Sequence, residues 1–90
     1  MKGEVVTLVT HVGEIIGRVV EDNVDSIELS DPRLFVNQAE GSGLAPGICM
    51  TGVTDPSDAV FYKGSIVAVV ATAPELEKAW QQQTSGIILQ

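Results

Sequence analysis

Hydrophobic and polar residues succeed one another in short blocks along most of this chain, and the pattern predicts a mostly β fold. The blocks are rich in Val and Ile, which favour strands, and polar or Gly-containing turns separate them. The third block alternates strictly, because Ile27 and Leu29 stand between polar neighbours, as in a strand with one buried face. We expect five strands, near residues 5–10, 15–20, 27–30, 59–62 and 65–71.

Two of these blocks carry a further signal. Gly17 lies inside the second block, where a glycine indicates a sharp bend or a close approach of another backbone. Residues 66–71 are apolar without alternation, which is typical of a strand covered on both faces. The pattern therefore predicts a small, strongly bent sheet.

The segment at residues 37–58 breaks the strand pattern. It contains Gly-Ser-Gly, Ala-Pro-Gly and Asp-Pro sequences, which are turn signals. We expect a long, variable loop here, with at most a short strand at residues 48–50. The Asp31-Pro32 pair is expected to interrupt the strand before it, and residues 34–36 are a candidate continuation of that strand.

The end of the chain changes to helical spacing. Thr72 and Glu75 fit a capping box, Pro74 fits a first turn, and Leu76 and Trp80 share a face. We expect a short amphipathic helix over residues 73–84, with Gly86 as its C-cap. The apolar residues 87–89 are expected to pack against another surface, such as a neighbouring subunit.

Length and composition narrow the class of protein. Ninety residues form a single domain spanning 1–90, and such a small core combined with 44% hydrophobic residues favours oligomerisation. The net charge of −7 and the absence of a polybasic run disfavour a broad nucleic-acid surface or an anionic membrane as partner. No signal peptide or membrane span is expected, and the lone Cys49 favours a reducing, cytoplasmic setting.

The chemistry-bearing residues do not form a catalytic pattern. His11 is the single histidine and Cys49 the single thiol, and an apolar neighbourhood predicts that this thiol is buried and inert. No metal-ligand spacing or phosphate-cradling glycine loop is present. We therefore expect no catalytic residues, no metal and no cofactor, and hence no enzyme.

Two local motifs carry a resemblance to a known family. Residues 13–29 contain Gly13, Gly17, Asp22, Ile27 and Leu29, and this stretch resembles the first motif of the Sm/LSm family. Residues 61–69, centred on Tyr-Lys-Gly, look like the family's second motif. Because the chain starts with a strand and ends with a helix, it is more similar to a divergent bacterial or bacteriophage member than to a splicing subunit.

The resemblance implies a fold and an assembly. The fold would be a strongly bent, five-stranded Sm-like barrel of SH3 type with a short C-terminal helix. In the family the fourth strand of one subunit pairs with the fifth strand of the next, which closes a homo-oligomeric ring, here of about five to seven subunits. The residues expected at this interface are Phe61, Tyr62, Ile66, Val67 and Val69.

The resemblance also implies a single-stranded RNA site at the pore of the ring. The family's aspartate, stacking residue, asparagine and basic residue fall on Asp22, Val24, Ser26 and Lys63, followed by Gly64. Val24 cannot stack on a base as an aromatic residue does, and lysine lacks the planar guanidinium of arginine. A ring that binds RNA and a ring that serves as a structural or docking scaffold are both open, as is a monomeric SH3-like or OB-like barrel that recognises a protein.

Overall fold

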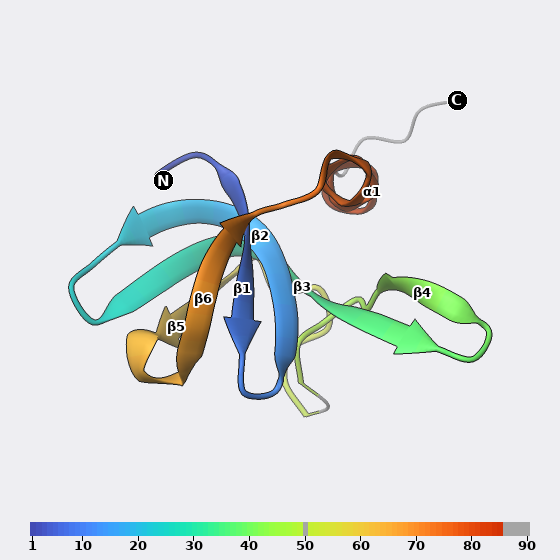
Figure 1. Ribbon diagram of the computed structural model, residues 1–90, viewed down its shortest axis with the longest axis horizontal. Helices are drawn as coiled ribbons and strands as arrows, with labels where there is room; N and C mark the ends of the chain where they lie inside the picture. The colour runs from blue at the N-terminus through green and yellow to red at the C-terminus, as the bar shows by residue number, and fades with distance from the viewer. Residues whose placement is uncertain (50, 86–90) are drawn as a thin grey trace.

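A computed structural model describes residues 1–49 and 51–85. It is mostly β, as expected, with one short helix near the C-terminal end (Figure 1). The elements are β1 (Val5–Thr10), β2 (Gly13–Asp22), β3 (Ser26–Gln38), β4 (Gly41–Leu44), β5 (Asp58–Tyr62), the 3-10 turn η1 (Lys63–Ser65), β6 (Ile66–Ala71) and α1 (Pro74–Thr84).

The strands form one antiparallel system whose order is β4-β3-β2-β1-β6. Strand β5 pairs with the first half of β3, from Ser26 to Ser30, and β4 pairs with its second half. No ladder among the described residues joins β5 to β6, so the sheet stays open between two strands that follow each other in the chain.

The bend of the sheet originates in β2 and β3, which curve around the core in Figure 1. The ladder between them shifts register between Ile16 and Arg18, and again between Val19 and Glu21. A Cβ atom at Gly17 would lie 3.0 Å from the Cβ of Leu29, so the close approach expected at this glycine is present.

Two clusters of apolar side chains make up the core. The larger cluster fills the inside of the curved sheet and consists of Val6, Leu8, Ile15, Val19, Ile27 and Leu29. The smaller cluster lies under α1, where Trp80 is buried against Val5 and Ile16. The indole Nε1 of Trp80 donates a hydrogen bond of 2.8 Å to the carbonyl of Asp31, which fixes the helix to β3.

The expected five-strand count and the extent of the loop are wrong. Strand β3 runs through Asp31-Pro32 to Gln38 and forms a hairpin with β4, so a sixth strand lies inside the segment predicted as loop. Asp31 takes a φ of 50°, which lets the strand turn without ending. Irregular structure begins at Ala45, and Ile48 and Cys49 are not in a strand, while Met50 lies outside the described residues.

The expected helix is confirmed, but its expected cap is not. The N-cap is Ala73, and no side chain caps the first turn. The hydroxyl of Thr72 instead lies 2.9 Å from the hydroxyl of Thr7 in the interior. The predicted C-cap, Gly86, and the tail at 87–89 lie outside the described residues. No helix in the described part is long and apolar enough to cross a membrane.

Candidate functional site at the β2–β3 loop and the η1 turn

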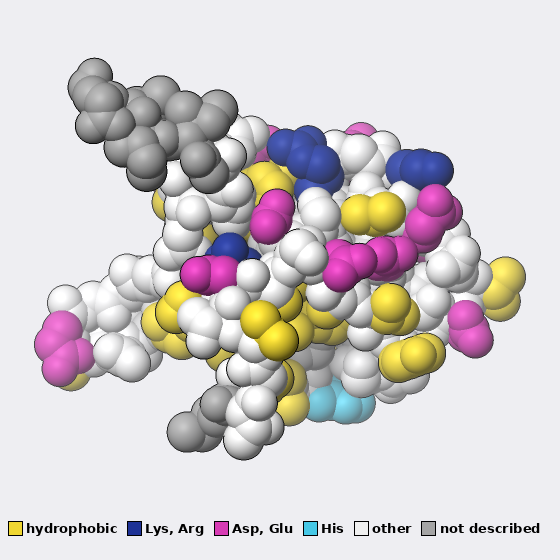
Figure 2. Space-filling model, turned by 180° about the vertical axis from the view of Figure 1, so that it is seen from behind, with side chains coloured by type: hydrophobic (Ala, Val, Ile, Leu, Met, Phe, Trp, Pro, Cys, Tyr) yellow, Lys and Arg dark blue, Asp and Glu magenta, His cyan; other side chains and the backbone are white. Residues whose placement is uncertain are grey.

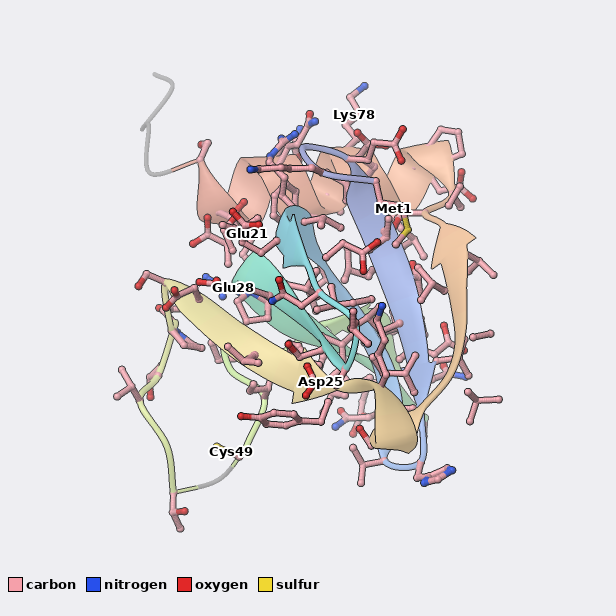
Figure 3. All side chains as sticks on the ribbon, turned by 90° about the vertical axis from the view of Figure 1, so that its left-hand side faces the viewer. Met1, Glu21, Asp25, Glu28, Cys49 and Lys78 are labelled. Carbon is pink, nitrogen blue, oxygen red and sulfur yellow. The ribbon has the colours of Figure 1, made fainter. Side chains whose placement is uncertain are left out.

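The loop between β2 and β3 and the turn η1 lie against each other. The backbone N–H of Lys63 donates a 2.9 Å hydrogen bond to the carbonyl of Asp25, which ties the two segments together (Figure 3). The chain folds this way because Ser26 pairs with Tyr62 at the start of the β3–β5 ladder. The residues carried over from the family's RNA site are therefore neighbours in space.

The charge of Lys63 is already matched within the chain. Its ammonium lies 2.9 Å from an Oδ1 oxygen of Asp22, and each side chain is more than a third exposed. Such an exposed pair contributes roughly 0–1 kcal/mol to stability, so a ligand could displace the aspartate at low cost. In the described structure, however, the local positive charge is neutralised.

The other residues of the predicted pocket differ in accessibility. Val24 is 97% exposed at the tip of the loop, and Gly64 faces open space. Ser26 is buried, and its hydroxyl lies 3.4 Å from the side-chain amide of Asn23. A ligand in this loop would contact Val24 and Lys63, whereas the Ser26 hydroxyl is turned inward.

A row of carboxylates lies next to this loop on the outer face of the sheet (Figure 2). Glu21 on β2 is the register partner of Glu28 on β3, and the side chain of Glu28 hydrogen-bonds to Asp58 on β5. This hydrogen bond, together with partial desolvation and the charges of Asp58 and Glu21, raises the pKa of Glu28. Lys2 offsets part of the charge by pairing with Glu21 at 3.2 Å.

The residues predicted for a subunit interface divide into two groups. Phe61, Ile66 and Val69 are half-buried and pack against the core of the same chain. Tyr62 and Val67 are 65% and 64% exposed, so these two have apolar surface to offer a partner.

Two further members of this exposed surface were not among the residues predicted for the interface. Val60 and Val70 are each about half exposed, on β5 and β6 respectively. The two-residue period along β5 could have found Val60, since it shares a face with Tyr62. Strand β6 was expected to be covered on both faces, and within the single chain that expectation is wrong because Val67 and Val70 face outward.

Both strands that flank η1 have an open edge. Strand β5 pairs with β3 and strand β6 with β1, and among the described residues neither has a second neighbour. The β1–β6 ladder shifts register at Thr10, where Ile66 and not Val67 is the partner, so Val67 is an extra residue in a bulge. The regular part of the β6 edge therefore runs from Ala68 to Ala71.

The chemistry-bearing side chains stay dispersed. Among residues 1–49 and 51–85, no three His, Cys, Asp or Glu side chains form a group that could hold a metal ion. Cys49 is exposed, so the prediction of a buried thiol is wrong. His11 is exposed in the turn between β1 and β2.

No protein-family model matches the chain, and no curated protein matches its sequence.

Proposed function

We propose that this chain is the subunit of an Sm-like homo-oligomeric ring, in which β5 of one copy pairs with β6 of the next. The observation that carries the proposal is the pair of open strand edges on either side of η1, flanked by exposed Val60, Tyr62, Val67 and Val70. The resemblance of residues 13–29 and 61–69 to the two Sm motifs points the same way.

An open strand edge in water exposes backbone groups that can pair with another chain. Unpaired N–H and C=O groups on an edge strand template pairing with other chains, and exposed apolar neighbours strengthen that tendency. Only three residues separate β5 from β6, yet the two strands diverge from η1 (Figure 3). If β5 of each copy pairs with β6 of the next and the series closes into a ring, no copy is left with an open β5 or β6 edge.

The test is the solution mass of the assembly, measured by sedimentation or light scattering. We expect the wild type to have several times the 9.5 kDa mass of one chain. Val60→Lys places a charge on the outer face beside the β5 edge and should lower this mass. Val12→Lys makes the same change at an exposed position in the β1–β2 turn and should leave it unchanged. A wild type that sediments as single chains would exclude the ring.

Single-stranded RNA binding is a second candidate function, favoured by the backbone hydrogen bond from Lys63 to Asp25, which places Lys63 beside the loop that bears Val24. In a ring, this loop would be repeated around the pore. The acidic row at Glu21, Glu28 and Asp58 acts against it, because each ring position would add negative charge near the phosphates.

Binding of short U-rich and A-rich RNA at low salt tests this second candidate. If RNA binds, titration should give a saturable signal. Lys63→Ala should then weaken the affinity by about tenfold, in line with loss of a charged contact. Lys78→Ala is the matched control, since Lys78 is an exposed lysine on α1 (Figure 3). Absence of binding at low salt would leave the ring as a structural or docking scaffold.

A further inference from the structure

The second half of β3 and strand β4 form a two-stranded arm, residues 35–44. The arm projects away from the body on the side opposite β5 and β6 (Figure 1). Side chains at its tip, residues 37–42, are all exposed. An isolated two-stranded ribbon is marginally stable in water at best, so this arm would gain from a third strand.

The register of the arm shows which backbone groups are free. The N–H of Ala45 donates to the carbonyl of Leu34 at 2.8 Å, which makes these two residues a hydrogen-bonded pair. Hydrogen-bonded and non-hydrogen-bonded pairs alternate in an antiparallel ladder, so the N–H and C=O of Ser42 and Leu44 point away from β3. The carbonyl of Leu44 accepts a 3.1 Å hydrogen bond from Gln83. Ser42 has no such partner among the described residues.

Apart from its length of four residues, this edge lacks the devices that protect edge strands. The sequence of β4 is Gly-Ser-Gly-Leu, without lysine, proline or a bulge, and its small side chains allow another backbone to approach closely. At the base of the arm, a mostly apolar groove of about 320 Å³ is lined by Leu34, Ala45, Pro46, Gly47 and Ile48, together with Cys49 and Thr54.

The charge distribution indicates the partner. Residues 34–54 contain one charged residue, Glu40, in a chain whose net charge is −7. Two copies of an acidic chain repel each other least where their facing surfaces are uncharged. The arm carries one charge, at its tip, and is otherwise uncharged, so it suits a second copy of this chain.

We propose that the arm is a second self-association surface, at which two copies pair their β4 strands antiparallel about a twofold axis at Ser42. The N–H of each Ser42 would donate to the carbonyl of the other Ser42. The two Glu40 side chains would then stand four residues apart along the ribbon, about 14 Å, which exceeds the screening length of about 8 Å in physiological salt. Combined with the β5–β6 contact, a twofold contact whose axis crosses the ring axis at a right angle stacks two rings face to face.

The contact is tested by the masses of four chains: wild type, Ser42→Pro, Val60→Lys and the double variant. Proline removes the outward N–H of Ser42 and no hydrogen bond of the β3–β4 ladder. We expect Ser42→Pro to halve the wild-type mass, Val60→Lys to leave pairs of chains, and the double variant to give single chains. Ser42→Ala keeps the N–H and should retain the wild-type mass.

The outcomes separate this contact from the ring. If the ring fails and the arm contact holds, the wild type is a pair of chains that Ser42→Pro divides. Ser42→Asp, which places two carboxylates face to face at the axis, covers the case in which proline disturbs the arm. Wild-type mass in both Ser42→Pro and Ser42→Asp, with folding confirmed by circular dichroism, would overturn the inference.

Discussion

Gly17 is where a single residue type determines the curvature of the sheet. The position faces Leu29, and a Cβ atom there would also lie 3.1 Å from the carbonyl oxygen of Ser30. The glycine is needed for space and not for a left-handed backbone, since its φ does not fall in the positive range. Any side chain here must push β2 away from β3.

We therefore expect Gly17→Ala to destabilise the fold by about 1–3 kcal/mol, the usual cost of overpacking. Gly64→Ala is the matched control, because nothing lies within 4 Å of a Cβ atom at that glycine. Urea unfolding measures both variants. An equal loss of stability in the two would mean that Gly17 does not relieve a steric contact.

Trp80 holds the helix to the sheet through both its ring and its N–H group. The side chain is buried, the guanidinium of Arg18 lies 5.4 Å from the centre of the ring, and Asp31 accepts the indole hydrogen bond. Asp31 is also the residue with positive φ where β3 turns. Trp80 thus stabilises a backbone conformation that a non-glycine residue adopts at a cost.

Trp80→Phe should lower the unfolding free energy by about 1–3 kcal/mol, because it leaves the Asp31 carbonyl without its partner. Trp80→Ala should cost about 3–5 kcal/mol through the cavity as well. Chemical denaturation followed by far-ultraviolet circular dichroism measures both. A loss below about 0.5 kcal/mol in Trp80→Phe would show that the hydrogen bond adds nothing to helix docking.

Strands β2, β3 and β5 share the acidic row, and this row makes the pairing of β3 with β5 depend on pH. The pKa of Glu28 is raised, chiefly by its hydrogen bond to Asp58, so the folded chain holds a proton that the unfolded chain releases. The resulting stabilisation is complete below the unfolded-state pKa of about 4.3 and is lost as pH rises through the higher folded-state pKa.

Glu28→Gln should remove that part of the pH dependence, because glutamine can donate to Asp58 at every pH. The measurement is the urea midpoint between pH 4 and pH 7 for the wild type and the variant. Glu14→Gln, at the opposite end of β2 from Glu21, is the control. An unchanged slope in Glu28→Gln would show that the Glu28–Asp58 pair does not bind a proton in the folded chain.

At the scale of the whole molecule, the net charge of −7 opposes self-association while the exposed apolar residues of β5 and β6 favour it. Added salt screens the repulsion between copies and leaves burial of apolar surface intact. Binding to RNA has the opposite salt dependence, since it releases counterions. Salt therefore distinguishes the two proposed functions.

We expect dissociation of the assembly on dilution to shift to lower protein concentration when sodium chloride rises from about 20 to 300 mM. Sedimentation over a dilution series at each salt concentration provides the measurement. An assembly that falls apart as salt is added would instead be held by ion pairs between copies, and the apolar edges would not be its interface.

Much of the fold follows from local pattern. Blocks of apolar, mostly β-branched residues bounded by turns predicted β1, β2, β5 and β6, because such blocks have few alternatives to strand, and the alternation of Ile27 and Leu29 predicted the start of β3. The helical spacing of Leu76 and Trp80 predicted α1. Local pattern missed β4, since Gly-Ser-Gly has no strand propensity and pairs only because β3 extends beyond Pro32.

The sequence by itself determined that the chain is mostly β and that its sheet bends at Gly17. It also placed Asp22, Val24 and Lys63 in or beside two turns. Only the tertiary structure decided that Lys63 is paired with Asp22, that Ser26 is turned inward, and that Phe61 belongs to the core while Tyr62 is exposed. Spacing along a chain fixes which side of a strand a residue occupies. Which of those sides is covered depends on strands distant in sequence, and here the β5 and β6 edges are left open.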